Sequence, residues 1–184
     1  MDAIKYCMRG LPTSGMCQGL RDLIADLKDT NLVMVEIGSY AGQSTEIFAD
    51  SGKFSKVYAV DPWIQNYDIS DPGATIFDMT AVETEFDNVA AAYPNIIVKI
   101  KMTSLFASTT WNTPLDLVYL DGNHQYNAVC SDIRVYLPLL KNNGAIAGHD
   151  YSHWKDTVGK AVDDMLGKPD KLYQDGSWIK WLPR

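Results

Sequence analysis

Short apolar runs alternate with amphipathic stretches along this chain, and the alternation predicts a parallel β-sheet flanked by helices. Runs typical of strands that are buried on both faces occupy residues 32–37, 56–60, 96–100, 115–120 and 145–148. Helical spacing of apolar residues is found in residues 15–28, 43–50, 79–93, 128–140 and 157–166. Repeated β and α units of this kind predict a doubly wound α/β fold.

Three segments interrupt the alternation. Residues 64–78 are polar and contain the turn signal Asp71-Pro72-Gly73, so we expect either a long loop that covers an acceptor or a disordered surface segment. Lys141-Asn-Asn-Gly144 predicts a turn. Further on, residues 171–174 and 177–181 flank Asp175-Gly176, which predicts a two-residue β-hairpin.

Composition narrows the class of protein. The 184 residues, 46% of them hydrophobic, predict one globular domain over residues 1–184. The net charge of -7 and the scattered Lys and Arg residues make nucleic acid a poor candidate partner. No run approaches about 18 apolar residues, and the first residues lack the apolar middle of a signal peptide, so we expect no membrane span. Cys7, Cys17 and Cys130 lack CxxC spacing and are expected to be reduced thiols in a cytoplasmic protein, with homo-oligomerisation left open.

The first candidate site follows the first predicted strand. Ligands bind an open α/β sheet beyond the carboxyl ends of its strands. Glycines in Glu36-Ile-Gly38-Ser-Tyr-Ala-Gly42 let the backbone approach a ligand, and amides at the next helix can receive an anion. The spacing is neither GxGxxG nor a P-loop, so a plain tight connection is the alternative.

Acids and histidines follow the other predicted strands. Asp61 is placed to accept hydrogen bonds from a ribose diol, the alternative being a helix cap or a loop carboxylate. Asp121 and Asp150 would repel each other at neighbouring strand ends unless a cation or proton lay between them, and oxygen ligands suit Mg²⁺ or Ca²⁺. His124 could then act as a general base. The alternative is that His149 and Asp150 cap the next segment while His124 is an exposed loop residue.

These residues also carry a family resemblance. Residues 35–44, Val-Glu-Ile-Gly-Ser-Tyr-Ala-Gly-Gln-Ser, are similar to the cofactor motif of catechol O-methyltransferase and of the macrocin and mycinamicin sugar O-methyltransferases. Residues 116–151 resemble methyltransferase family 24, and the similarity extends from Gly10 to Trp181. The resemblance implies a class I S-adenosylmethionine-dependent methyltransferase. Its expected fold is a mostly parallel, seven-stranded, Rossmann-like sheet that ends in an antiparallel hairpin.

The resemblance also implies residue roles. Asp61 would hold the ribose of S-adenosylmethionine, and Trp63 and Ser104 would lie near the adenine. Asp121 and Asp150 match metal-binding carboxylates, and His149 departs from the pattern, so it could bind the metal, replace it or act as the base. The other cofactor-binding candidates are Glu36, Gly38, Ser39, Tyr40, Gly42, Ser44 and Asp121.

The implied activity is methyl transfer to a hydroxyl of a sugar or another small molecule, assisted by a divalent cation. Asp121 and His124 are the expected catalytic residues, and Asp121, His149 and Asp150 the expected metal ligands. Cephalosporin hydroxylases resemble the same motifs, so an iron site made of His124, His149 and Asp150 is a second hypothesis. A non-catalytic protein that binds S-adenosylmethionine is a third.

Overall fold

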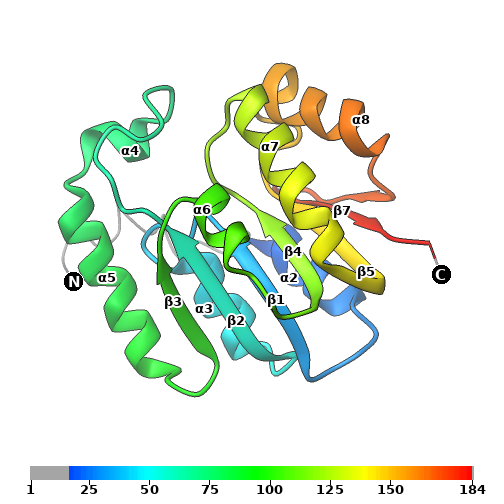
Figure 1. Ribbon diagram of the computed structural model, residues 1–184, viewed down its shortest axis with the longest axis horizontal. Coiled ribbons are helices and arrows are strands. Elements are labelled where there is room, and N and C mark those ends of the chain that lie inside the picture. The colour runs from blue at the N-terminus through cyan, green and yellow to red at the C-terminus, as the bar shows by residue number, and fades with distance from the viewer. Residues whose placement is uncertain (1–16, 184) are drawn as a thin grey trace.

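The computed structural model describes residues 17–183, whose strands form one sheet of order β3-β2-β1-β4-β5-β7-β6 (Figure 1). Strands β1 to β5 are mutually parallel, and β7 runs antiparallel to both β5 and β6. The prediction of a doubly wound, mostly parallel, seven-stranded sheet with a terminal antiparallel hairpin is therefore confirmed. The strands are β1 (Leu32–Ile37), β2 (Phe54–Asp61), β3 (Ile97–Lys101), β4 (Leu115–Leu120), β5 (Leu140–Gly148), β6 (Lys171–Leu172) and β7 (Trp178–Trp181).

Helices cover both faces of this sheet. Figure 1 shows α6 and α7 in front of the strands and α2 and α3 behind them. The predicted helix over residues 15–28 is found as α2, although Gly15 and Met16 lie outside the described residues, as does Cys7. The helices are α2 (Gln18–Asp26), α3 (Gln43–Asp50), α4 (Pro72–Ile76), α5 (Met79–Ala92), α6 (Ser104–Thr109), α7 (Tyr126–Tyr136) and α8 (Lys160–Leu166), with a 3₁₀ turn, η1 (Leu137–Leu139), and a π turn, η2 (Lys155–Gly159).

The apolar runs are continuous because the central strands are buried on both faces. Successive side chains of a strand point to opposite faces of the sheet. Met34 and Leu117 accordingly pack with α2 and α3, whereas Val35 and Val118 pack with α7 and α8. All four side chains are fully buried, so the central strands are fixed in register and their carboxyl ends are held side by side.

Two of the irregular segments differ from the expectation. Residues 64–78 contain the helix α4, whose start is fixed by Pro72 and by the Asp71 carboxylate, which accepts a hydrogen bond from the Gly73 amide. Residues 141–144 belong to β5 rather than to a free turn. They bulge where the register shifts beside Leu115, with Asn143 in the left-handed region and the Lys141 ammonium paired with Asp116.

The hairpin exists, but its connection is longer than the predicted two residues. The strand β6 ends at Leu172 and β7 begins at Trp178. The cause is Asp175, whose carboxylate accepts hydrogen bonds from the Leu20 amide of α2, at 2.8 Å, and from the Ser177 amide, at 3.0 Å. The turn is therefore shaped by its contact with α2.

Within residues 17–183, no helix has both the length and the apolar character needed to cross a membrane. Cys17 and Cys130 are free thiols, Cys130 being buried.

Candidate functional site

The bend after β1 brings the carboxyl ends of β1 and β4 into contact. Gly38 has a φ of 87°, and a Cβ at this position would lie 2.2 Å from the carbonyl oxygen of Asp121. The Asp121 amide donates to the Ile37 carbonyl at 2.8 Å, and the Gly38 amide donates to Val60 at 2.9 Å. Only glycine fits this bend, as its place in the sequence motif suggests.

A buried carboxyl group lies beneath the bend. Glu36 is completely buried, and the Thr45 hydroxyl donates to its Oε2 atom. Burial raises the pKa of Glu36 to about 7, despite the lowering effect of the nearby hydroxyl groups of Ser44 and Thr45. Glu36 Oε1 and the hydroxyl of the buried Ser39 have no hydrogen-bond partner among residues 17–183. Unsatisfied polar atoms at this position suit a polar ligand group.

A first cavity of about 340 Å³ opens beside the ends of β1 and β2. Asp61 lines it, and its two carboxylate oxygens accept the amides of Tyr40, at 2.9 Å, and Trp63, at 2.7 Å. Burial raises the pKa of Asp61, and each oxygen keeps a lone pair for a further donor. The predicted residues that line this cavity are Gly38, Tyr40, Asp61, Ser104 and Asp121.

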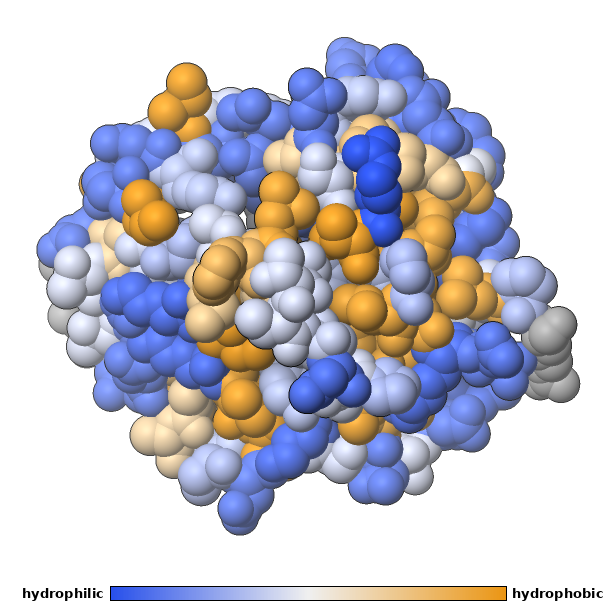
Figure 2. Space-filling model, in the orientation of Figure 1, coloured by the Kyte–Doolittle hydropathy of each residue, from blue (hydrophilic) through white to orange (hydrophobic). Residues whose placement is uncertain are grey.

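Apolar side chains form the rim of the first cavity. Ile64, Tyr67 and Leu105 line the cavity, and all three are exposed at its mouth. Figure 2 shows hydrophobic residues gathered on the same face of the molecule, around α6. The cavity therefore combines a polar floor with an apolar rim.

A second cavity, of about 680 Å³, lies on the other side of the glycine bend. Gly38, Tyr40, Asp71 and Asp121 line both cavities, so the two meet at this wall. The predicted residues Ser39, Ser44, His124, His149 and Asp150 also line the second cavity.

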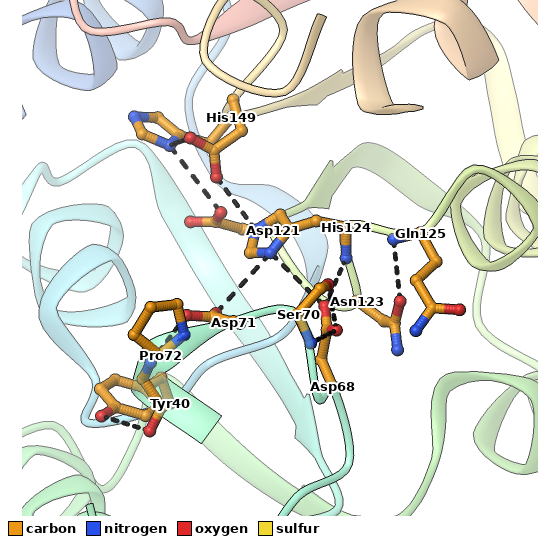
Figure 3. Close-up of polar contacts among 12 residues, drawn as sticks. Tyr40, Asp68, Ser70, Asp71, Pro72, Asp121, Asn123, His124, Gln125 and His149 are labelled. Atoms are coloured by element: carbon orange, nitrogen blue, oxygen red, sulfur yellow. Dashed lines mark hydrogen bonds and ion pairs between the residues drawn. The ribbon is translucent and has the colours of Figure 1, made fainter. Parts of the chain in front are cut away.

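His124 lies among carboxylates in the second cavity. Its Nε2 atom is 3.0 Å from Asp150 Oδ2, and its Nδ1 atom is 3.6 Å from Asp68 and 3.7 Å from Asp71 (Figure 3). Its ring stacks on Trp154 at a centroid distance of 5.1 Å. Burial alone would lower the pKa of His124, but the facing carboxylates outweigh burial and raise it.

Asp150 is the centre of a histidine cluster. It follows β5 with a φ of 63°, a left-handed conformation that aspartate tolerates. Its Oδ1 atom lies 3.2 Å from His149 Nδ1 and 3.3 Å from His153 Nδ1. With His124 at Oδ2, all three histidines of the sequence face this one carboxylate. The imidazoles of His124 and His149 outweigh burial and hold the pKa of Asp150 well below its usual range.

Two further pKa values are shifted here. Burial lowers the pKa of His149, but Asp150 and Asp121 outweigh that effect and raise it to about 9. Burial raises the pKa of Asp121 to about 6, although the nearby His149 opposes this shift. His149 Nδ1 is 3.9 Å from Asp121 Oδ1. Asp121, His124, His149 and Asp150, separated by up to 29 positions in sequence, thus meet at one place.

The segment 64–78 forms a wall of the site. The Asp68 carboxylate accepts the His124 amide at 2.9 Å, and the Tyr40 hydroxyl donates to the Gly73 carbonyl at 3.2 Å. Asp68 is buried, although the segment is mostly polar. This segment therefore packs over the loop that follows β4, as Figure 3 shows for Asp68 and Asp71.

Three predicted cofactor residues line neither cavity among the described residues. Glu36 is buried beneath the bend, and Gly42, with a φ of 82°, directly precedes α3. Trp63 is buried against Phe86, and its indole N–H donates to the Tyr40 carbonyl at 2.9 Å. Trp63 thus supports the bend from below through its packing on Phe86 and its hydrogen bond to Tyr40.

Sequence patterns did not single out Asp68, Asp132 or His153 as site residues. Asp132 lines the first cavity, accepts the Ser104 hydroxyl at 2.6 Å and has its pKa raised to about 6 by burial. The sequence signal for Asp132 is a charged residue directly before the apolar Ile133, which is buried in α7. The signal for His153 is its spacing of four residues from His149.

Comparison with known proteins places this arrangement in context. Residues 35–151 match a sequence family described as a methyltransferase domain, family 24. A curated relative, the uncharacterized protein R132 of Acanthamoeba polyphaga mimivirus, is 22% identical over 150 residues, which are 80% of this chain. The chain spans only 65% of the length of that relative.

Solved structures share the fold at low sequence identity. A "putative methyltransferase" from Streptococcus mutans, crystallised with SAH, is 15% identical and superposes with a TM-score of 0.61 over 87% of this chain and 92% of its own. CalS11, a TDP-rhamnose 3'-O-methyltransferase of calicheamicin biosynthesis, is 14% identical, with a TM-score of 0.62 over 90% of this chain and 79% of its own.

Proposed function

Because this chain belongs to the methyltransferase domain family, we propose that it transfers a methyl group from S-adenosylmethionine to a hydroxyl of a small molecule, with the help of a divalent cation. The observation that carries the proposal is the shared wall between the two cavities, at Gly38, Tyr40 and Asp121. A cofactor in one cavity and an acceptor in the other would meet at this wall. Positioning of this kind supplies much of the rate of a group transfer.

The residues of the first cavity fit S-adenosylmethionine, which supplies an electrophilic methyl group when it is bound. Asp61 keeps lone pairs for the ribose hydroxyls, and Ile64 and Leu105 offer apolar contacts for the adenine. On the second-cavity side of the shared wall, the Ser39 hydroxyl and the amides after Gly38 suit the polar end of the methionine part. Tyr40, Ser44, Ser104 and Asp121 complete this proposed cofactor site, whereas Glu36, Gly42 and Trp63 support it from behind.

The residues of the second cavity fit a divalent cation and an acceptor. Both ring nitrogens of His124 are buried and face carboxylates, with Nε2 3.0 Å from Asp150 Oδ2. We assign Asp121, His149 and Asp150 to the cation, which would lower the pKa of an acceptor hydroxyl. The acceptor class, a sugar or another hydroxylated metabolite, is consistent with the TDP-rhamnose methyltransferase of the same fold.

His124 is the proposed general base. Asp150 Oδ2, 3.0 Å from Nε2, favours the tautomer that carries its proton on Nε2. Nδ1 is then free to take the proton of the acceptor hydroxyl, and Asp150 stabilises the imidazolium that results. The stack on Trp154 holds the ring in this orientation.

Two substitutions test these roles. His124→Ala and Asp121→Ala are each expected to lower turnover by about 10²–10⁴-fold, the usual contribution of an acid–base group, while the affinity for S-adenosylmethionine changes little. Turnover is measured with labelled S-adenosylmethionine on a panel of hydroxylated acceptors, and affinity by calorimetry. Asp156→Ala, which removes an exposed acid outside the site, is the control. Unchanged turnover in both variants would contradict the assigned roles.

A further inference from the structure

The histidine cluster contains a ligand set that the sequence motif did not include. His149, Asp150 and His153 each place one ligand atom within 4.8 Å of the other two. Two ligands bound at about 2.1 Å to one tetrahedral ion lie about 3.4 Å apart. The distances of 3.2 and 3.3 Å from Asp150 Oδ1 to the two imidazole Nδ1 atoms match this spacing.

Backbone hydrogen bonds fix the segment that carries these three side chains. The His149 amide donates to the Leu120 carbonyl at 3.0 Å, and the Trp154 amide donates to the Asp150 carbonyl at 2.9 Å. His153 Nδ1 packs against Gly176, and a Cβ added to Gly176 would lie only 2.8 Å from this nitrogen. The cluster is therefore fixed by β4, by its own turn and by the connection between β6 and β7, and little reorganisation is needed to bind an ion.

We propose that His153 joins His149 and Asp150 as a ligand of the proposed cation, with Asp121 beside them, and that this cation is a divalent first-row transition metal, such as Zn²⁺ or Co²⁺, in preference to Mg²⁺. Two imidazoles and one carboxylate suit Zn²⁺, Co²⁺ and related ions, whereas Mg²⁺ prefers an all-oxygen shell. The two oxygens of Asp150 divide the cluster, with Oδ1 facing this ligand set and Oδ2 facing His124.

The exposure of the cluster suits an ion that keeps one coordination position open for a further ligand. The His153 side chain is 59% exposed and that of His149 is 28% exposed, so solvent and an acceptor oxygen reach the Oδ1 side. The role of the ion in this inference, to activate the acceptor hydroxyl, rests on the proposed function. The binding of the ion itself requires no methyl transfer, so it can be tested separately.

The test uses the full chain, freed of any histidine tag and of metal by a chelator. Titration with Co²⁺ is followed by its visible absorption, and Zn²⁺ and Mg²⁺ are then added as competitors. We expect one Co²⁺ per chain, displaced by equimolar Zn²⁺ but not by a hundredfold excess of Mg²⁺. Because the chain has three histidines, NMR of their imidazole nitrogens before and after Zn²⁺ also identifies the ligands directly in the unaltered protein.

Variants separate this ligand set from its neighbours. His153→Asn is expected to weaken Co²⁺ binding at least tenfold, whereas the neighbouring surface variant Lys155→Ala should bind as the unaltered protein does. Three results would overturn the proposal: unchanged binding by His153→Asn, displacement of Co²⁺ by Mg²⁺, or Zn²⁺-dependent imidazole shifts at His124 alone. If Co²⁺ binds as expected and no acceptor is methylated, the proposed function fails and this inference stands.

Discussion

Glu36 links the glycine bend to a dependence of stability on pH. The pKa of this buried carboxyl group is raised to about 7 from its ordinary value of 4.5. A raised pKa in the folded state stabilises the fold below pH 4.5, and this contribution is lost as the pH rises through 7. The free energy of unfolding should therefore fall between these pH values by about 3 kcal/mol through Glu36 alone.

The neutral variant Glu36→Gln isolates this effect. Denaturant unfolding from pH 4.5 to 8 should show a steeper decline for the unaltered protein than for the variant. Asp121 and Asp132, whose pKa values are also raised, are present in both proteins, so their effects cancel in the difference. Parallel profiles would mean that Glu36 is charged in the folded protein.

Individual residues were predictable where a local pattern fixes their place. Asp61 is the last residue of β2, Gly38 and Asp121 directly follow β1 and β4, and all three line the first cavity. Trp63 stands at a similar position, but packing against Phe86 takes its ring into the core, which no local pattern reveals. Asp68 reaches His124 across 56 positions of sequence, a contact set by how the segment 64–78 folds back.

At the scale of elements, α2 depends on a residue that is distant in sequence. The residue before α2, Cys17, gives no side-chain cap, and Asp175 supplies one by accepting the Leu20 amide. Loss of a helix cap costs about 1 kcal/mol. Asp175→Ala should lower the melting temperature by about 2–4 °C, and calorimetry would measure it.

The matched control for Asp175 is its exposed neighbour in the same turn, Gln174→Ala, which should leave the melting temperature unchanged. A Cβ on Gly19 would lie 2.0 Å from Asp175 Oδ1, so Gly19→Ala should destabilise the unaltered protein more than it destabilises Asp175→Ala. Equal costs in the two backgrounds would show that α2 and the hairpin connection are independent.

Long buried strands were predictable because a strand that is buried on both faces has apolar residues at successive positions. The expected bounds of β1 and β4 agree with the structure. The helices α4 and α6 have five and six residues, too few to show a helical period, and neither was expected. The bulge in β5 follows from a contact with Asp116, and the five-residue connection between β6 and β7 follows from a contact with α2. Both partners are distant in sequence, so the local pattern predicted a simple turn and a two-residue hairpin instead.

For the whole molecule, the strand order confirmed the architecture that the family resemblance implied. The alternation of strands and helices predicts the fold class, but strand order depends on which strands pair across the sheet. The division of the site into two cavities was not predictable either, because it arises where the segment 64–78 and the glycine bend enclose space. Convergence of acids at one edge, in contrast, follows from parallel strands alone.

Binding of the cofactor should stabilise the whole fold, since the first cavity is lined by four separate parts of the chain. S-adenosylhomocysteine at about a hundred times its dissociation constant adds about 2.7 kcal/mol to the free energy of unfolding. For a domain of this size, that corresponds to a rise of about 5–10 °C in melting temperature.

NAD⁺ at equal concentration is the control, because the glycine bend lacks the GxGxxG spacing. Asp61→Asn should reduce the rise, since its amide group replaces an acceptor oxygen with a donor. An equal rise in melting temperature with both ligands, or no rise with S-adenosylhomocysteine, would contradict the assignment of the first cavity to the cofactor.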